Sequence, residues 1–297
     1  MKVSMLMRVF MKNGIYKAAR RILGLFLTIV LLNIGKDYYA ADRATGSVGQ
    51  AEGNTLLVTI LVSDPDYIWD LSGERDKERL ESVDWALKVS TEFITEAAAS
   101  WGKELHFIYD TSPGSDLLYE QTYTISMAAK NLDDAGSSEI SKYEERQRVL
   151  KNDLQYHVPS EHLKEKYNTD NIGYLFIINT EADAPNLRSH AETCFVDGSR
   201  DPEYACINFF EEGWQNPPAV YAHEILHLFG VPDLYMLDSY DEEYKKLILD
   251  YFQNDIMYQP WGSGGEGYTK KSYLKVDSEI MQLTAFYLGW TDQYPNT

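Results

Sequence analysis

The chain has 297 residues, of which 44% are apolar and 33 are Phe or Tyr, enough for a sizeable core, so a chain disordered throughout is excluded. The formal net charge is −19, and residues 1–41 hold seven Lys and Arg against one acid, so the remainder carries −25. Such an acidic body repels phosphate backbones, which excludes nucleic acid as a partner.

An export signal is predicted over residues 1–41, where basic residues precede an apolar run at 22–34. As a helix, these 13 residues cover about 20 Å, less than the roughly 30 Å hydrocarbon core of a membrane. A cleaved signal peptide is therefore favoured. No small-x-small cleavage triplet follows the run, so an N-terminal membrane anchor stays open. Either alternative puts the rest of the chain outside the cytoplasm, secreted or anchored through residues 22–34.

Residues 42–54 are small and polar and contain glycine, which is typical of a linker, and one domain is predicted over 55–297. The continuous apolar, β-branched run at 55–62 predicts a strand buried on both faces. Residues 74–101 carry apolar side chains at helical spacing and are followed by Gly102, so they predict a long amphipathic helix.

The remaining elements before residue 217 alternate in type. Strands are predicted at 105–109 and 172–179, a charged surface helix at 138–154, and two further strands at 190–196 and 204–210. Cys194 and Cys206 lie on either side of a turn-rich stretch in this last region. In an oxidising compartment such a pair typically forms a disulfide, and the alternative is two buried free thiols.

The segment NPPAVYAHEILHLFGVPDLY begins at Asn216 and carries the chemistry. Asn216 is a suitable N-cap, prolines suit the first turn, and Gly230 is a suitable left-handed stop, so a helix is predicted at 217–229. His223 and His227 then lie one turn apart on one face, where both imidazoles can reach a single metal ion.

Glu224 follows the first histidine and is expected to act as the general base that takes a proton from an attacking water. A catalytic zinc site also needs a third protein ligand and one open position. Asp233, three residues after Gly230, is the favoured third ligand. His190 and the acids between residues 238 and 243 remain alternatives.

The resulting pattern, H-E-x-x-H-x-x-G-x-x-D, resembles the zinc motif of metzincin peptidases with the last ligand changed to Asp, as in snapalysin-like peptidases. Pro232 and Tyr235 also match the G-x-P-D-x-Y run of immune inhibitor A-like secreted peptidases. The resemblance covers about twenty residues, with a weaker similarity at 254–258, where Met257 resembles the methionine of a Met-turn. By this resemblance, Tyr258 or Tyr235 would stabilise the oxyanion.

The resemblance implies an α+β fold of zincin or metzincin type. A twisted mixed sheet, a backing helix and the zinc helix would form an upper part, residues 55–230. A smaller lower part, residues 231–297, would hold the Met-turn and a closing helix at 277–289, with the cleft between the two parts. The implied activity is that of an exported zinc endopeptidase acting on peptides or proteins. It would use one Zn²⁺ ion, held by His223, His227 and Asp233, with Glu224 as general base.

Two other functions stay open: a zinc amidase acting on a non-protein substrate, and a secreted binding module with an inactive zinc site. Glu224 argues against an inactive site, because a purely structural zinc normally has four protein ligands. Acidic pairs could also hold Ca²⁺, although a solvated surface is favoured for them. These pairs are Asp133 with Asp134, Glu211 with Glu212, and Glu242 with Glu243.

Overall fold

The structure is a computed structural model that describes residues 47–129, 137–184, 186–193, 202–237, 240–260 and 270–295. All of them lie in the second of the two units into which the chain divides, residues 43–297. The predicted export signal lies outside the described residues. Within the described part of the chain, no helix is both long enough and apolar enough to cross a membrane.

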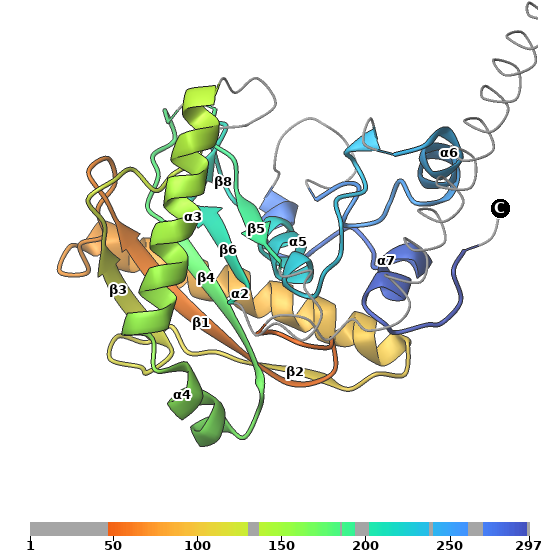
Figure 1. Cartoon of the computed structure of the whole chain (residues 1–297), viewed down its shortest axis with the longest axis horizontal. Helices are drawn as coiled ribbons and strands as arrows, with labels where there is room; N and C mark the ends of the chain where they lie inside the picture. The colour runs from red at the N-terminus through yellow and green to blue at the C-terminus, as the bar shows by residue number, and fades with distance from the viewer. Residues whose placement is uncertain are drawn as a thin grey trace, which may run out of the picture. The chain divides into compact units, whose positions relative to one another are not determined.

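A six-stranded mixed sheet forms the centre of the fold (Figure 1). Strand β1 (Gly53–Ser63) pairs in parallel with β4 (Asn171–Ile178), and β4 pairs in parallel with β6 (Tyr204–Asn208). Strand β5 (His190–Glu192) runs antiparallel to β6 and is the last strand on this side. The fold is therefore α+β with a mixed sheet, as expected.

On its other side, β1 pairs with two short strands, both in parallel. Strand β2 (Leu105–Ile108) pairs with the first half of β1, and β3 (Leu118–Thr122) pairs with the second half. The strands predicted at 55–62, 105–109 and 172–179 are confirmed, whereas β3 was not predicted. Both β1 and β4 are covered on two faces, which is why their sequences are apolar without alternation.

Helices cover both faces of the sheet (Figure 1). Helices α2 (Glu74–Ser100) and α5 (Pro218–Leu228) pack against each other and share one apolar core with the side chains of Leu57 and Leu61. Helices α3 (Ser137–His157) and α4 (Ser160–Tyr167) pack on the other face, beside Leu56. The helices predicted at 74–101 and 138–154 are confirmed as α2 and α3.

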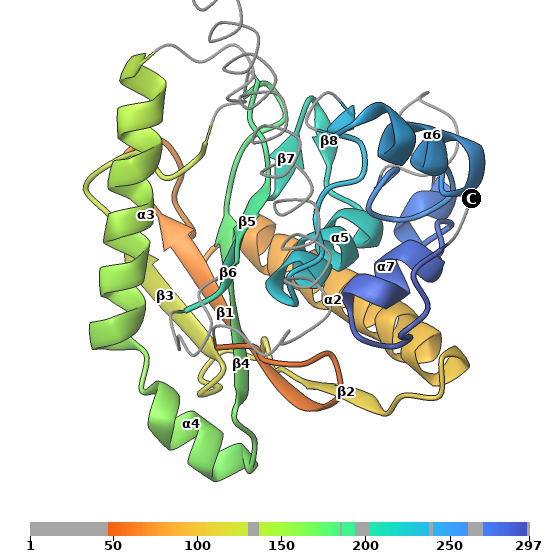
Figure 2. The ribbon, with the colours of Figure 1, turned by 45° about the vertical axis from the view of Figure 1, so that its right-hand side comes forward.

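The chain after α5 forms a smaller group of elements on the side of α5 away from the sheet (Figure 2). It contains α6 (Glu242–Tyr251), the 3-10 helix η2 (Lys270–Tyr273) and α7 (Gln282–Tyr287). The predicted closing helix, 277–289, is thus helical only in its second half. The reason is tertiary: Glu279 N donates to Asn254 O at 3.0 Å, and Glu279 O accepts from Ile256 N at 2.9 Å.

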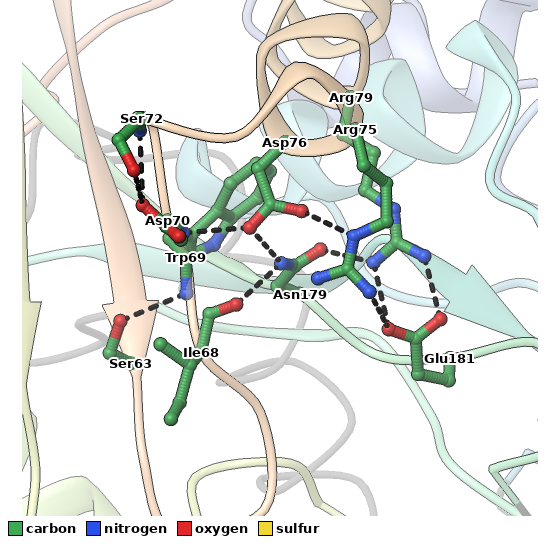
Figure 3. Close-up of polar contacts among 10 residues, drawn as sticks. All are labelled: Ser63, Ile68, Trp69, Asp70, Ser72, Arg75, Asp76, Arg79, Asn179 and Glu181. Carbon is green, nitrogen blue, oxygen red and sulfur yellow. Dashed lines mark hydrogen bonds and ion pairs between the residues drawn. The ribbon is translucent and has the colours of Figure 1, made fainter.

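A polar network anchors the start of α2 to the end of β4 (Figure 3). Two nitrogens of Arg79 donate to the carboxylate of Glu181, at 2.6 and 3.3 Å. The buried carboxylate of Asp76 accepts from the backbone N of Asp70 at 2.7 Å and from Asn179 Nδ2 at 3.2 Å. This network fixes the first residues of the loop that runs from β4 to the edge strand β5.

Packing of the domain begins before residue 55. Val48 and Ala51 are buried in the core shared by α2 and α5. Val48 N donates to the carboxylate of Glu203 at 2.9 Å, and Ser47 O accepts from Ile172 N at 2.8 Å. Part of the segment predicted as a linker therefore lies against the sheet.

Candidate metal centre

The helix α5 carries the two histidines of the predicted metal site. The sequence predicted the residue that ends this helix but not the residue that caps its start. Pro217 is the N-cap, not Asn216, whose Nδ2 instead donates to Asn208 O at 2.8 Å. A side-chain cap is less needed here because a proline in the first turn lacks the N–H that a cap would satisfy. At the other end Gly230 has φ +82, a left-handed conformation that glycine adopts without strain, so the predicted stop is confirmed.

Two histidines and one acid converge on a single point. His223 Nε2 and His227 Nε2 are 3.0 Å apart, and each lies 3.1 Å from Asp233 Oδ1. The other ring nitrogens face backbone carbonyls: His223 Nδ1 is 3.1 Å from Ile256 O, and His227 Nδ1 is 2.6 Å from Val231 O. Because a carbonyl only accepts, each Nδ1 carries a proton and each Nε2 turns toward the shared point.

The geometry and the chemistry of this cluster fit Zn²⁺. Tetrahedral zinc with bonds of about 2.0–2.1 Å to nitrogen holds neighbouring ligand atoms roughly 3.3 Å apart. The observed separations of 3.0 and 3.1 Å are close to that value. Asp233 Oδ1 is buried, and it lies 3.1 Å from the Nε2 atoms of both histidines. Three ligands also leave a tetrahedral ion one open position, which is typical of a catalytic site.

Burial and mutual charge shift the pKa values of all three groups of the cluster. Burial lowers the pKa of His227, but the negative charges of Asp233 and Glu224 outweigh it and raise the pKa to about 9. Burial and the neighbouring His227 lower the pKa of His223. Burial raises the pKa of Asp233, but the two histidines hold it far below its usual range. A metal ion that binds here must displace the proton of His227, so affinity should fall in acid.

Glu224 lies beside the cluster without joining it. Its side chain is buried in α5, and Oε2 accepts no hydrogen bond from the described residues. Burial, the largest cause, raises the pKa of Glu224 to about 8. The charge of His227 acts in the opposite direction, and the charge of Asp233 raises the pKa further. A carboxyl group buried beside the three converging groups, and not one of them, has the position expected of a general base.

The loop that contains Met257 lies directly against the ligands. Ile256 O is the partner of His223 Nδ1, and Met257 O accepts from Leu234 N at 2.9 Å, one residue after the third ligand. Met257 itself is fully buried. The loop thus contacts both α5 and the segment that follows it.

Sequence reasoning missed Asp255, which holds this loop in place. Its buried carboxylate accepts from Met257 N at 2.9 Å, from Thr284 Oγ1 at 2.8 Å and from Met281 N at 3.0 Å. Burial raises the pKa of Asp255 to about 6, although its hydrogen bonds lower it. One side chain therefore ties the Met257 loop to the start of α7.

Asp255→Asn is expected to destabilise the fold at neutral pH by about 1–3 kcal/mol. The amide keeps the shape of the carboxylate, but its NH₂ group must face one of three donors and leave it unsatisfied. Urea unfolding of the purified variant checks this. Thr284→Val, which removes only one of the donors, should cost about 1 kcal/mol. An Asp255→Asn protein as stable as the wild type would contradict this account of the loop.

Of the two candidate tyrosines, Tyr235 lies at the cluster. Its ring stacks on His223 with centroids 6.0 Å apart and planes 24° apart. Burial, followed by the charges of Asp233 and Glu224, raises the pKa of Tyr235. Tyr258 packs at the edge of the core, and none of its described contacts reaches the two histidines or Asp233. Of the two tyrosines, Tyr235 is therefore the one that lies against a predicted metal ligand.

Among the described residues, the rival third ligands do not meet the two histidines. His190 lies on β5, with its ring 5.4 Å from that of Tyr143 on α3. Asp241 caps α6 by accepting from Tyr244 N at 2.8 Å, and Asp238 lies outside the described residues. Among the residues that the structure describes, His223, His227 and Asp233 form the one group with metal-ligand spacing.

The cysteines and the acidic pairs have separate surroundings. Cys206 is buried and lies opposite His190 in the sheet register. Its predicted partner Cys194 lies outside the described residues, so the disulfide stays a prediction.

Of the proposed Ca²⁺ pairs, Asp133 with Asp134 also lies outside the described residues. The carboxylate of Glu211 accepts from Ser189 N and Oγ, both at 2.8 Å, so it is already bonded within the protein.

The edge strand β5 lies next to α5. Thr193, immediately after β5, donates through its hydroxyl to His227 O, and β5 packs against α5. Since β5 is the last strand of the described sheet on this side, one row of its backbone groups is unpaired within the sheet.

Comparison with known proteins gave no match to any protein-family model, curated protein or solved structure. The function of this site must therefore be argued from its own geometry.

Proposed function

We propose that the chain is an exported zinc-dependent endopeptidase with a metzincin-like site. The observation that carries the proposal is the convergence of two imidazole nitrogens and Asp233 Oδ1 on one point, beside a buried carboxylate that is not a ligand. Three protein ligands and one open position are typical of catalytic zinc, whereas structural zinc is closed by four.

The chemistry follows from the residues around this point. His223, His227 and Asp233 would hold a zinc ion, which would supply Lewis acidity and a bound water with a pKa lowered to about 7. Glu224 accepts a proton as the water oxygen attacks the peptide carbonyl, and it returns that proton to the amine nitrogen when the C–N bond breaks. Tyr235 donates a hydrogen bond to the oxygen that becomes negative during the attack.

The position of β5 favours a peptide over other amides. An extended peptide can pair with the unpaired side of an edge strand through its main chain. Thr193 joins the end of β5 to His227 O, so a peptide paired with β5 would pass beside the metal ligands. This arrangement supports hydrolysis of a peptide bond in the interior of a substrate chain. We therefore prefer an endopeptidase to an amidase that acts on a compact substrate.

The proposal is tested by incubating the purified protein with a peptide library, with and without a chelator, and identifying products by mass spectrometry. New peptide termini are expected, their formation should stop with chelator, and added Zn²⁺ should restore it. Hydrolysis of non-peptide amides without peptide cleavage would favour the amidase. Zinc binding without any hydrolysis would favour a binding module.

A further inference from the structure

The third ligand differs from the other two in how its position is set. His223 and His227 are spaced by the backbone of α5, which fixes their separation. Asp233 lies beyond the end of that helix, in a segment without regular secondary structure. The direction of its carboxylate must therefore be fixed by contacts with other parts of the chain.

Those contacts fix the peptide unit that follows Asp233. Its N–H belongs to Leu234 and donates to Met257 O at 2.9 Å. Its C=O belongs to Asp233 and accepts from the hydroxyl of Tyr240. The described backbone has no cis peptide, so these two groups point in opposite directions from one rigid plane. The plane is thus held from both sides, and it carries the Cα atom of the ligand.

Tyr240 is itself well anchored. Its backbone N donates to Leu237 O at 3.1 Å, and its ring lies 4.6 Å from the ring of Tyr244 on α6. The hydroxyls of Tyr244 and Tyr287 are 2.6 Å apart, which links α6 to α7. The Tyr240 hydroxyl is therefore a fixed donor and not a mobile surface group.

We propose that Tyr240 is a positioning residue of the metal centre, holding the peptide unit after Asp233 so that its carboxylate faces the two histidines. This inference rests on the proposed function, because it concerns the same zinc site. Tyr240 does not touch the metal point. Its effect is to reduce the freedom that Asp233 would otherwise lose on binding a metal ion.

The test compares Tyr240→Phe with Tyr244→Phe by titration of the purified metal-free protein with Zn²⁺ against a competing chelator. Tyr240→Phe should weaken zinc affinity by about tenfold, within the range usual for outer-shell partners. Tyr244→Phe is the matched control: it removes one hydroxyl from the same aromatic cluster, but that hydroxyl binds Tyr287 and not Asp233. Its zinc affinity should equal that of the wild type. In an Asp233→Ala background, Tyr240→Phe should change affinity by less than about twofold, because the ligand it positions is gone.

Other outcomes separate the inference from the proposed function. Unchanged affinity in Tyr240→Phe, or an equal loss in Tyr244→Phe, would overturn the positioning role and leave the zinc site intact. An effect of Tyr240→Phe that persists without Asp233 would also overturn it, since the hydroxyl would then act by another route. A wild-type protein that binds no zinc would refute the site itself.

Discussion

Glu224→Gln is expected to keep the metal and lose hydrolysis. Gln has nearly the shape of Glu but cannot accept the proton of an attacking water, and the three ligand atoms of the cluster are untouched. The loss of a general base typically lowers the rate by on the order of 10²–10⁴. Zinc content and kcat/KM should be measured on the same preparation.

A suitable control is Glu161→Gln, which changes a carboxylate on α4 that is 89% exposed and forms a surface ion pair with Lys164. Such pairs contribute little to stability, so this variant should match the wild type in zinc content and in turnover. Full activity in Glu224→Gln would refute the mechanism. Loss of zinc from Glu224→Gln would show that this carboxylate helps to hold the metal.

The elements that sequence predicted best are those whose pattern is local. The apolar runs of β1 and β4 predict strands, and the apolar spacing of α2 predicts a helix. Neither prediction requires knowledge of the distant residues that these elements contact. The two histidines of α5 belong to the same class, because helical geometry alone sets their separation. Gly230 was predictable for a similar reason, since a single backbone conformation explains it.

Elements that depend on tertiary contacts were missed or misjudged. Strand β3 (LYEQT) is short and largely polar, and it is a strand because it pairs with the second half of β1. Asn216 has the right chemistry for an N-cap, but its side chain binds Asn208 O instead. Near the start of the predicted closing helix, Glu279 pairs with Asn254 and Ile256, next to Met257, instead of forming helical hydrogen bonds.

The candidate site divides in the same way. The ligands and the base could be found by spacing, whereas Asp255 and Tyr240 could not, because their roles depend on which distant backbone groups they meet. The sequence favoured Tyr258, near the Met-turn, over Tyr235 as the oxyanion donor, whereas in the structure it is Tyr235 that stacks on His223. A solitary acid or tyrosine in a loop has no periodic signal by which its partners could be predicted.

Asp233→Ala is expected to cause the largest loss of zinc affinity of the changes considered. It leaves two histidines at the point where three ligand atoms meet, and a lost ligand should cost more than the roughly 10–100-fold typical of outer-shell changes. Hydrolysis should fall with the metal. Zinc titration of the wild type and the variant measures both the affinity and its change.

Asp233→His is the companion change that separates loss of a ligand from disruption of the loop. An imidazole is itself a good zinc ligand, so this variant should bind zinc more tightly than Asp233→Ala, even if its activity stays low because the ring is larger and differently placed. Equal weakness in both variants, with an unchanged free energy of unfolding, would mean that the loop tolerates only a carboxylate at this point. Wild-type zinc affinity in Asp233→Ala would remove Asp233 from the site, and with it the metzincin-like assignment. The roles of His223, Glu224 and His227 would then stand on their helical spacing alone, with the third ligand to be sought among the acids near the start of α6.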